Sequence, residues 1–146
     1  MKKSICASLE ASILKKLSAL ETGLSCVGLL EVAAGGTLKQ EDLSSVQVRV
    51  FGVQQPHESM SMFSVAAEVR LNVEQAETAN GELFAASYEA LALYFERIMI
   101  GDGCVELETS DVHVDGLKMT GGDLDFDTTG GVWYAVWNMT LTGRIK

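Results

Sequence analysis

A strict alternation of apolar and polar side chains runs through Val132 to Ile145, close to the end of the chain. One side carries Trp133, Ala135, Trp137, Met139, Leu141 and Ile145, and the other carries Tyr134, Asn138, Thr140, Thr142 and Arg144. A period of two is typical of a β-strand with one buried face. The run also exceeds the usual strand length of about five or six residues. The sequence therefore predicts a long strand in a large sheet with one face in contact with water.

Other segments repeat this pattern over shorter distances. The clearest is Phe63–Val73, where alternate residues from Phe63 to Val73 are apolar. Shorter strands are predicted at Val27–Val32 and Val46–Val53, and strand-like pieces at Val105–Leu107 and Val112–Met119. Half-buried strands of this kind are typical of an antiparallel sheet with one solvated face.

Two segments have the spacing of amphipathic helices. In residues 4–20, apolar side chains recur every three or four positions, and Thr22-Gly23 ends the pattern. In residues 80–99, Asn80 is a candidate cap and Gly101 a candidate C-cap. The second apolar stripe consists of Phe84, Tyr88, Leu91, Phe95 and Ile98.

The order of these elements predicts the fold class. One helix and three strands precede the second helix, and two or three strands follow it. We expect an α+β fold, with a mostly antiparallel mixed sheet and two main helices packed on one face. The 146 residues, of which 47% are hydrophobic, suit one domain spanning residues 1–146.

Two segments are predicted to be surface loops. Residues 54–60 lack periodicity and carry polar and turn residues, so we expect an exposed loop and a possible contact site. Its candidate contact residues are Gln54, Gln55, Pro56, His57 and Glu58.

The glycine-flanked segment 121–131 is predicted to be an acidic hairpin loop. Asp123, Asp125 and Asp127 are spaced like the start of a calcium loop, but Thr128 and Tyr134 occupy positions where that motif has Gly and Glu. We therefore expect no metal site, and a solvated loop that can contact a neighbouring subunit.

The remaining candidate chemistry does not form an enzyme signature. His113 has Asp111 and Asp115 two residues away on each side, a pattern that a polar sheet face also produces. Cys6, Cys26 and Cys104 lack the spacing of a zinc site or a disulfide framework. No nucleotide-binding or nucleophile-elbow motif is present. The sequence predicts no enzyme activity and no cofactor.

The long last strand also suggests a contact surface. Trp133 and Trp137 fall on its apolar side and are predicted to anchor the core. Tyr134 and Val136 fall on the other side, where we expect an exposed pair that can contact another subunit.

Charge and hydropathy exclude two classes of partner. The net charge is −9, which argues against nucleic acid as a bound ligand because phosphate binding needs clustered cations. No apolar run reaches the roughly 18 residues that a membrane span requires. The Met-Lys-Lys start is followed by Glu10, Lys15 and Lys16, so we expect no signal peptide.

The element order, together with several segments, resembles the tail terminator proteins of long-tailed bacteriophages, the lambda-like minor tail proteins. The matching segments are the helices ASLEASILKKL and FAASYEALALYFERI, the strands VQVRVFGV and FSVAAEVRLNV, the loop QQPHESM and the closing strand WYAVWNMTLTG. The segment from Thr37 to Ser45 and the acidic segment 121–131 have no counterpart in this comparison.

The resemblance implies a homo-oligomeric ring, usually a hexamer, in the virion tail, assembled in the host cytoplasm. Such a ring caps the tail tube protein, joins it to a head-tail connector or neck protein, and lets DNA pass through its lumen. The alternative is a cytoplasmic α+β binding module for a small ligand or a protein partner, and a small enzyme is a third possibility. The acidic charge agrees with the ring hypothesis, because an acidic lumen would repel DNA phosphates.

Overall fold

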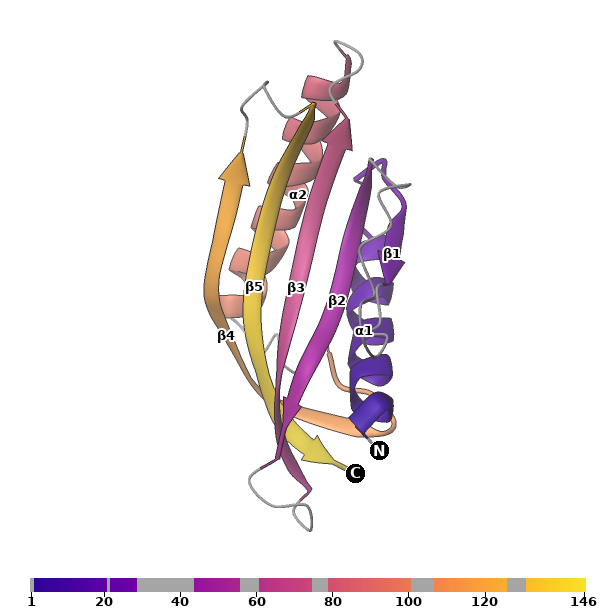
Figure 1. The fold of residues 1–146 in the computed structure, drawn as a ribbon, viewed down its shortest axis with the longest axis vertical. Coiled ribbons are helices and arrows are strands. Elements are labelled where there is room, and N and C mark those ends of the chain that lie inside the picture. The colour runs from indigo at the N-terminus through magenta and orange to yellow at the C-terminus, as the bar shows by residue number, and fades with distance from the viewer. Residues whose placement is uncertain are drawn as a thin grey trace.

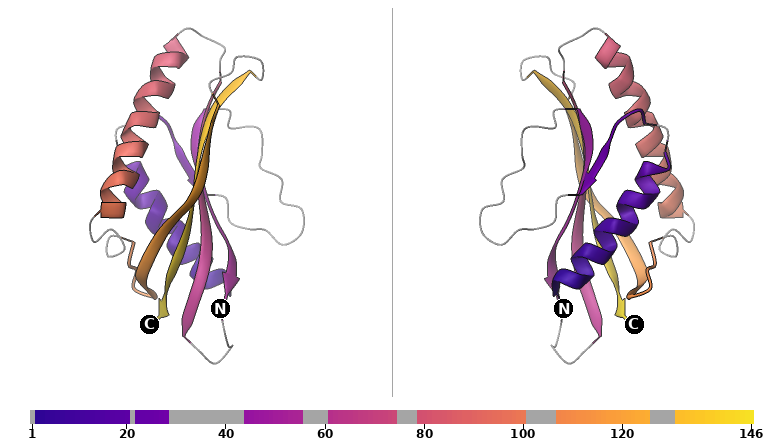
Figure 2. Two further views of the ribbon diagram at one scale, coloured as in Figure 1. Left: turned by 90° about the vertical axis from the view of Figure 1, so that its left-hand side faces the viewer. Right: turned by 90° about the vertical axis from the view of Figure 1, so that its right-hand side faces the viewer.

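Two helices lie on one face of a five-stranded sheet in the computed structural model of this chain (Figures 1 and 2). The structure describes residues 2–20, 22–28, 44–55, 61–74, 79–100, 107–125 and 131–146. Its elements are α1 (Lys2–Ser18), β1 (Cys26–Gly28), β2 (Ser45–Gln54), β3 (Met62–Glu74), α2 (Ala79–Ile100), β4 (Val112–Asp125) and β5 (Val132–Ile145). The predicted α+β fold is confirmed.

The strand order in the sheet is β1-β2-β3-β5-β4. The short β1 runs parallel to β2, whereas the β2–β3, β3–β5 and β4–β5 pairs are antiparallel. The sheet is thus mixed and mostly antiparallel, as predicted. The central pair, β3 and β5, stays in register from Met62–Arg144 to Glu74–Val132. This pairing explains why both strands carry such long alternating patterns.

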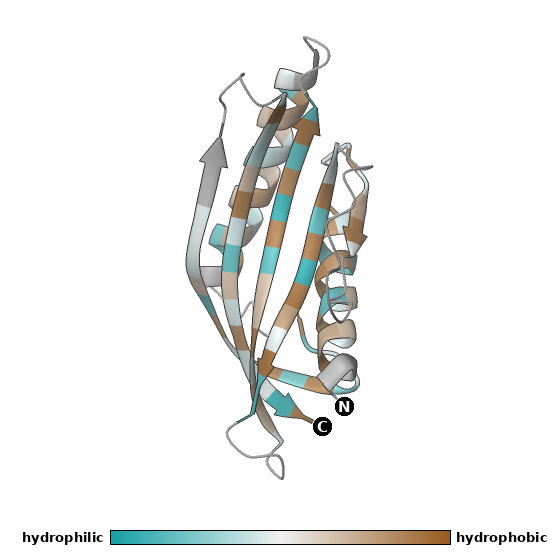
Figure 3. Cartoon of the chain, in the orientation of Figure 1, coloured by the Kyte–Doolittle hydropathy of each residue, from teal (hydrophilic) through white to brown (hydrophobic). Residues whose placement is uncertain are grey.

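The alternating pattern of β3 separates the two faces of the sheet. Figure 3 shows apolar and polar residues alternating along β3. Every second residue from Phe63 to Val73 is buried, and the residues between them are half-buried. On the helix side of β5, Ala135, Met139 and Leu141 are buried. Burial of these aliphatic side chains contributes about 1.5–3 kcal/mol each to folding. The core therefore lies between the helices and the inner face of the sheet.

The helices bury the stripes that the sequence predicts. Ile5, Leu9, Ile13 and Leu17 of α1 are all buried, and α2 buries Phe84, Leu91, Phe95 and Ile98.

Three aromatic pairs join α2 to β5. The ring centroids of Phe84 and Trp133 lie 6.1 Å apart, those of Tyr88 and Trp137 5.5 Å apart, and those of Phe95 and Trp137 5.3 Å apart. The prediction that both tryptophans anchor the core is confirmed, since both pack against it.

Several predicted boundaries change. The first helix ends at Ser18, and Ala19 and Leu20 form a turn by donating to the carbonyls of Lys16 and Leu17. Residues 29–32 of the predicted strand Val27–Val32 lie outside the described residues. So do residues 105 and 106, and Leu107 lies in a turn.

The predicted acidic loop at 121–131 is wrong in its first half. Strand β4 continues through Gly121 and Gly122 to Asp125, so Asp123 and Asp125 lie in a strand. The reason is β5, because β4 pairs with it from Ile145 back to Tyr134 with two register shifts. Pairing along the whole of β5 satisfies backbone groups that a loop would leave to water. Residues 126–130, including Asp127, lie outside the described residues.

Candidate interaction surfaces

The predicted loop contact is described only at its first residues. Gln54 is the last residue of β2 and is exposed, and Gln55 follows it and is half-buried. Pro56, His57 and Glu58 lie outside the described residues. The loop prediction is therefore neither confirmed nor contradicted there.

The predicted exposed pair on β5 is wrong for Val136, which is only 9% exposed. Val136 lies between Arg70 of β3 and Asp123 of β4 in the sheet register, so neighbouring strands flank it on both sides. Tyr134 is half-buried, and the Arg70 guanidinium carbon lies 5.4 Å from its ring centroid. Val136 is therefore packed between its neighbours and does not form an exposed contact.

Two aspartates of the segment that was predicted to be an acidic loop, Asp123 and Asp125, lie in β4. In the register, Asp123 is opposite Val136 and Asp125 is opposite Tyr134, with Leu124 between them. Within the described ranges, no group of three His, Cys, Asp or Glu side chains is placed to hold a metal ion.

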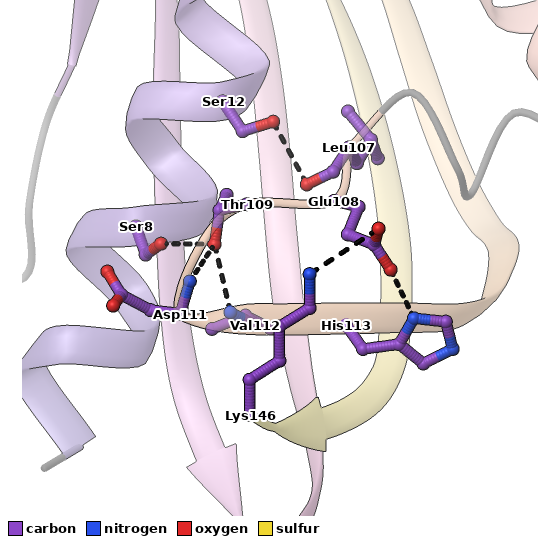
Figure 4. A network of polar contacts seen from close by, with 9 residues as sticks. All are labelled: Ser8, Ser12, Leu107, Glu108, Thr109, Asp111, Val112, His113 and Lys146. Atoms are coloured by element: carbon purple, nitrogen blue, oxygen red, sulfur yellow. Dashed lines mark hydrogen bonds and ion pairs between the residues drawn. The ribbon is translucent and has the colours of Figure 1, made fainter.

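His113 pairs with a carboxylate that the sequence analysis did not consider. Its Nδ1 contacts Glu108 Oε1, and Lys146 Nζ lies 3.5 Å from Glu108 Oε2 (Figure 4). The hydrogen bond with His113, followed by the charge of Lys146, lowers the pKa of Glu108. Asp115 instead accepts a hydrogen bond of 3.1 Å from Thr142. His113, Asp111 and Asp115 thus do not form the cluster that their spacing suggested.

Thr109 connects the same region to α1. Its hydroxyl lies 2.8 Å from Ser8 Oγ and accepts hydrogen bonds from the amides of Asp111 and Val112 (Figure 4). Ser12 Oγ also donates to the Leu107 carbonyl at 3.0 Å. These bonds fix the turn before β4 against α1, so the network around Thr109 is structural.

Glu10 is the one acidic residue that the described core encloses. It is 4% exposed and lies on the inner side of α1, where a Cβ atom at Gly28 would overlap its Oε1 atom. Burial raises the pKa of the Glu10 carboxyl to about 7, and a hydrogen bond from the Val50 backbone opposes this shift.

The bond to Val50 follows from the end of β1. The amide of Val46 donates to Ser25 on the β1 side, and alternate residues of a strand direct their amides to the same side. The described β1–β2 pairing stops at Gly28 and Val48. Glu10 therefore accepts the next amide of β2, that of Val50, and takes the place of a strand partner.

The helix α2 presents an apolar groove to solvent. Leu93 is 58% exposed there, and with Met62 (54%) it is one of two large hydrophobic side chains exposed in the described part of the chain. The groove has a volume of about 490 Å³ and is open along its length. We call it the α2 groove, and its lining residues are Leu20, Ala86, Glu89, Ala90, Leu93, Tyr94 and Arg97.

A second open groove lies beside α1. It has a volume of about 580 Å³, and small residues of α1 form one wall while Glu108, Thr109 and Asp111 form the other. Enclosed hollows that bury most of a ligand are typical of small-molecule sites. Neither of these two grooves has that form.

Neither the α2 groove nor the buried Glu10 was predicted from the sequence. Leu93 falls outside the apolar stripe of its helix, which is the signal that marks it as exposed. Glu10 falls inside the stripe of α1, four residues after the buried Cys6 and three before Ile13. Cys6 is buried and Cys26 half-buried, and burial raises the pKa of Cys26.

The function of this protein is inferred from the geometry of these surfaces. No family model matches this chain, and no curated protein matches its sequence. None of the helices in the described ranges is long and apolar enough to cross a membrane.

Proposed function

We propose that this protein is a structural subunit of a closed ring, the tail terminator of a long-tailed bacteriophage. In this proposal a homo-oligomer, which the resemblance implies has six copies, caps the tail tube and joins it to a head-tail connector or neck protein. DNA passes through the lumen, and the protein catalyses no reaction. The site of action is the virion tail, which is assembled in the host cytoplasm.

The sheet edges that no described strand covers are the observation that carries the proposal. Strand β4 is fourteen residues long, and no described strand pairs with its outer edge. On the other side, β1 pairs with only three of the ten residues of β2. Exposed strand edges need a cover, and a neighbouring copy in a ring supplies one.

Two features of β4 favour coverage by a specific neighbour over open-ended strand addition. Register shifts between Val114 and Gly116 and between Met119 and Gly121 interrupt its ladder. Bulges of this kind bend an edge and limit indiscriminate pairing. The open form of the two grooves also favours a protein partner over an enclosed small ligand.

The test is the mass of the purified protein in solution. Size-exclusion chromatography with light scattering should give a species near six times 15.7 kDa, and negative-stain micrographs should show annular particles. A monomer at every concentration, in the presence or absence of tail tube protein, would contradict the proposal.

A further inference from the structure

We propose that neighbouring copies in the ring join the α2 groove of one subunit to a corner of the next subunit formed by Met62 and Arg144. This inference rests on the proposed ring. We call the second surface the Met62 corner. The partner is therefore a second copy of this chain.

The two surfaces hold the large apolar side chains that the described fold leaves in water. Leu93 lies in the α2 groove beside Ala86 and Ala90, which gives a shallow apolar floor. Met62 is the first residue of β3 and is more than half exposed. A flexible methionine fits an irregular apolar hollow, so Met62 suits the floor of the groove.

The charges around the two surfaces are opposite in sign. Glu82, Glu89 and Glu96 are exposed on α2 at intervals of seven residues, and Glu89 lines the groove. Arg97 is the exposed cation on this part of the helix, and its guanidinium carbon lies 5.3 Å from the Tyr94 ring centroid. Arg97 also lines the groove and offsets Glu89, so the net negative charge of this side of α2 comes from Glu82 and Glu96, which lie outside the lining.

Arg144 supplies the matching positive charge. It is exposed and lies directly opposite Met62 in the β3–β5 pairing, so both side chains emerge on the same face. Arg144 makes no ion pair with the residues that the structure describes. An exposed cation next to an exposed apolar side chain complements a groove that has an apolar floor and the Glu89 carboxylate in its wall.

The positions of the two surfaces favour a ring. Both helices cover the inner face of the sheet, whereas Met62 and Arg144 belong to the opposite face (Figure 2). Figure 1 also places the start of β3 at the end of the sheet where the chain terminates. Two unlike surfaces on one subunit make a heterologous contact, and a heterologous contact that closes generates a ring.

A charge-exchange experiment on the full chain tests the contact. Glu89→Arg and Arg144→Glu should each weaken ring association by about tenfold or more, because each places like charges together. The double variant should recover association to within about threefold of the wild type, since the pair is restored in reverse. Light scattering over a concentration series measures the association.

Lys15→Glu is the matched control, because it makes the same charge change at an exposed residue of α1 outside both surfaces and away from the β4 edge. It should leave the association unchanged. Thermal unfolding of every variant separates a lost contact from a lost fold. A double variant as weak as the sum of the two single variants would overturn the proposed contact.

A cross-link provides a second, independent measurement. In the ring, Met62→Cys combined with Leu93→Cys should give disulfide-linked multimers on a non-reducing gel, while either variant alone should not. A ring that forms without these cross-links overturns the contact but leaves the proposed function standing. A wild-type chain that forms no ring overturns both. Cross-linking by one single variant with itself indicates a symmetric contact and also overturns the inference.

Discussion

Glu10 shows how a single residue can report on the edge of a sheet. A carboxyl that is 4% exposed has lost most of its hydration, and one oxygen, Oε2, has no hydrogen-bond partner among the described atoms. Desolvation disfavours the charged form, which is why the pKa of Glu10 rises to about 7. The hydrogen bond from Val50 accounts for the buried position of Glu10, because it satisfies an amide that lies beyond the described β1–β2 pairing.

The raised pKa predicts how stability depends on pH. Between pH 4.5, the ordinary pKa of Glu, and about 7, the folded state binds more protons at Glu10 than the unfolded state. The contribution of Glu10 to stability therefore falls as pH rises through this window. Glu10→Gln keeps an acceptor for Val50 and cannot ionise. We expect it to stabilise the protein by about 1–3 kcal/mol at pH 8 and to change stability little at pH 4.

Urea unfolding at the two pH values measures this difference. Glu96→Gln is the control, because it makes the same substitution at an exposed position of α2. An equal effect of Glu10→Gln at pH 4 and pH 8 would show that Glu10 does not titrate between them.

At the scale of elements, two adjacent glycines in β4 differ in how much space each leaves for a side chain. A Cβ atom at Gly122 would lie 2.6 Å from the Val136 carbonyl oxygen, whereas one at Gly121 would meet nothing within 4 Å. We expect Gly122→Ala to destabilise the fold by about 1–3 kcal/mol, because the β4–β5 pairing must shift. Gly121→Ala is the matched control and should change stability by less than about 1 kcal/mol. Denaturant unfolding of both variants measures the contrast, and equal stabilities would exclude the close approach.

The same glycines show where the sequence could not predict the structure. Their composition is typical of a turn, yet Gly122 serves a close approach between two strands that only the sheet register reveals. By contrast, the strict alternation of β3 and β5 predicted both strands to within one residue at each end. Long periodic elements are predictable because burial repeats along them, whereas a short strand such as β1 has too few residues to show a period.

Val136 shows why exposure on the candidate surfaces could not be predicted from the sequence pattern alone. Its position in the alternation correctly placed it on the side of β5 away from the helices. Its burial depends on the neighbours that β3 and β4 bring beside it, and those follow from strand order, which the pattern does not contain. Val136→Asp would thus place a charge at a buried position, so it tests the fold and not the subunit contact.

At the scale of the whole molecule, net charge makes the ring hypothesis testable through DNA. Six copies with a net charge of −9 each carry −54 together. A protein that binds duplex DNA gains affinity by releasing counterions from phosphates, and a strongly acidic ring has no excess of cations to do so. We expect the assembled ring to let DNA pass without retaining it, even at a low salt concentration of about 50 mM, where electrostatic binding is strongest.

A filter-binding or mobility-shift assay with the purified ring and linear duplex DNA checks this prediction, with a basic DNA-binding protein as the positive control. Retention that weakens steeply as salt is added would mean that cations line the lumen. The first candidates would then be the eight cations whose side chains the structure describes: Lys15, Lys16, Arg49, Arg70, Arg97, Lys118, Arg144 and Lys146. Arg144 is the most informative of these cations, because the proposed subunit contact places it between subunits and not in the lumen. If Arg144→Glu abolished DNA retention but left the ring intact, the Met62 corner would face the channel and not the neighbouring subunit.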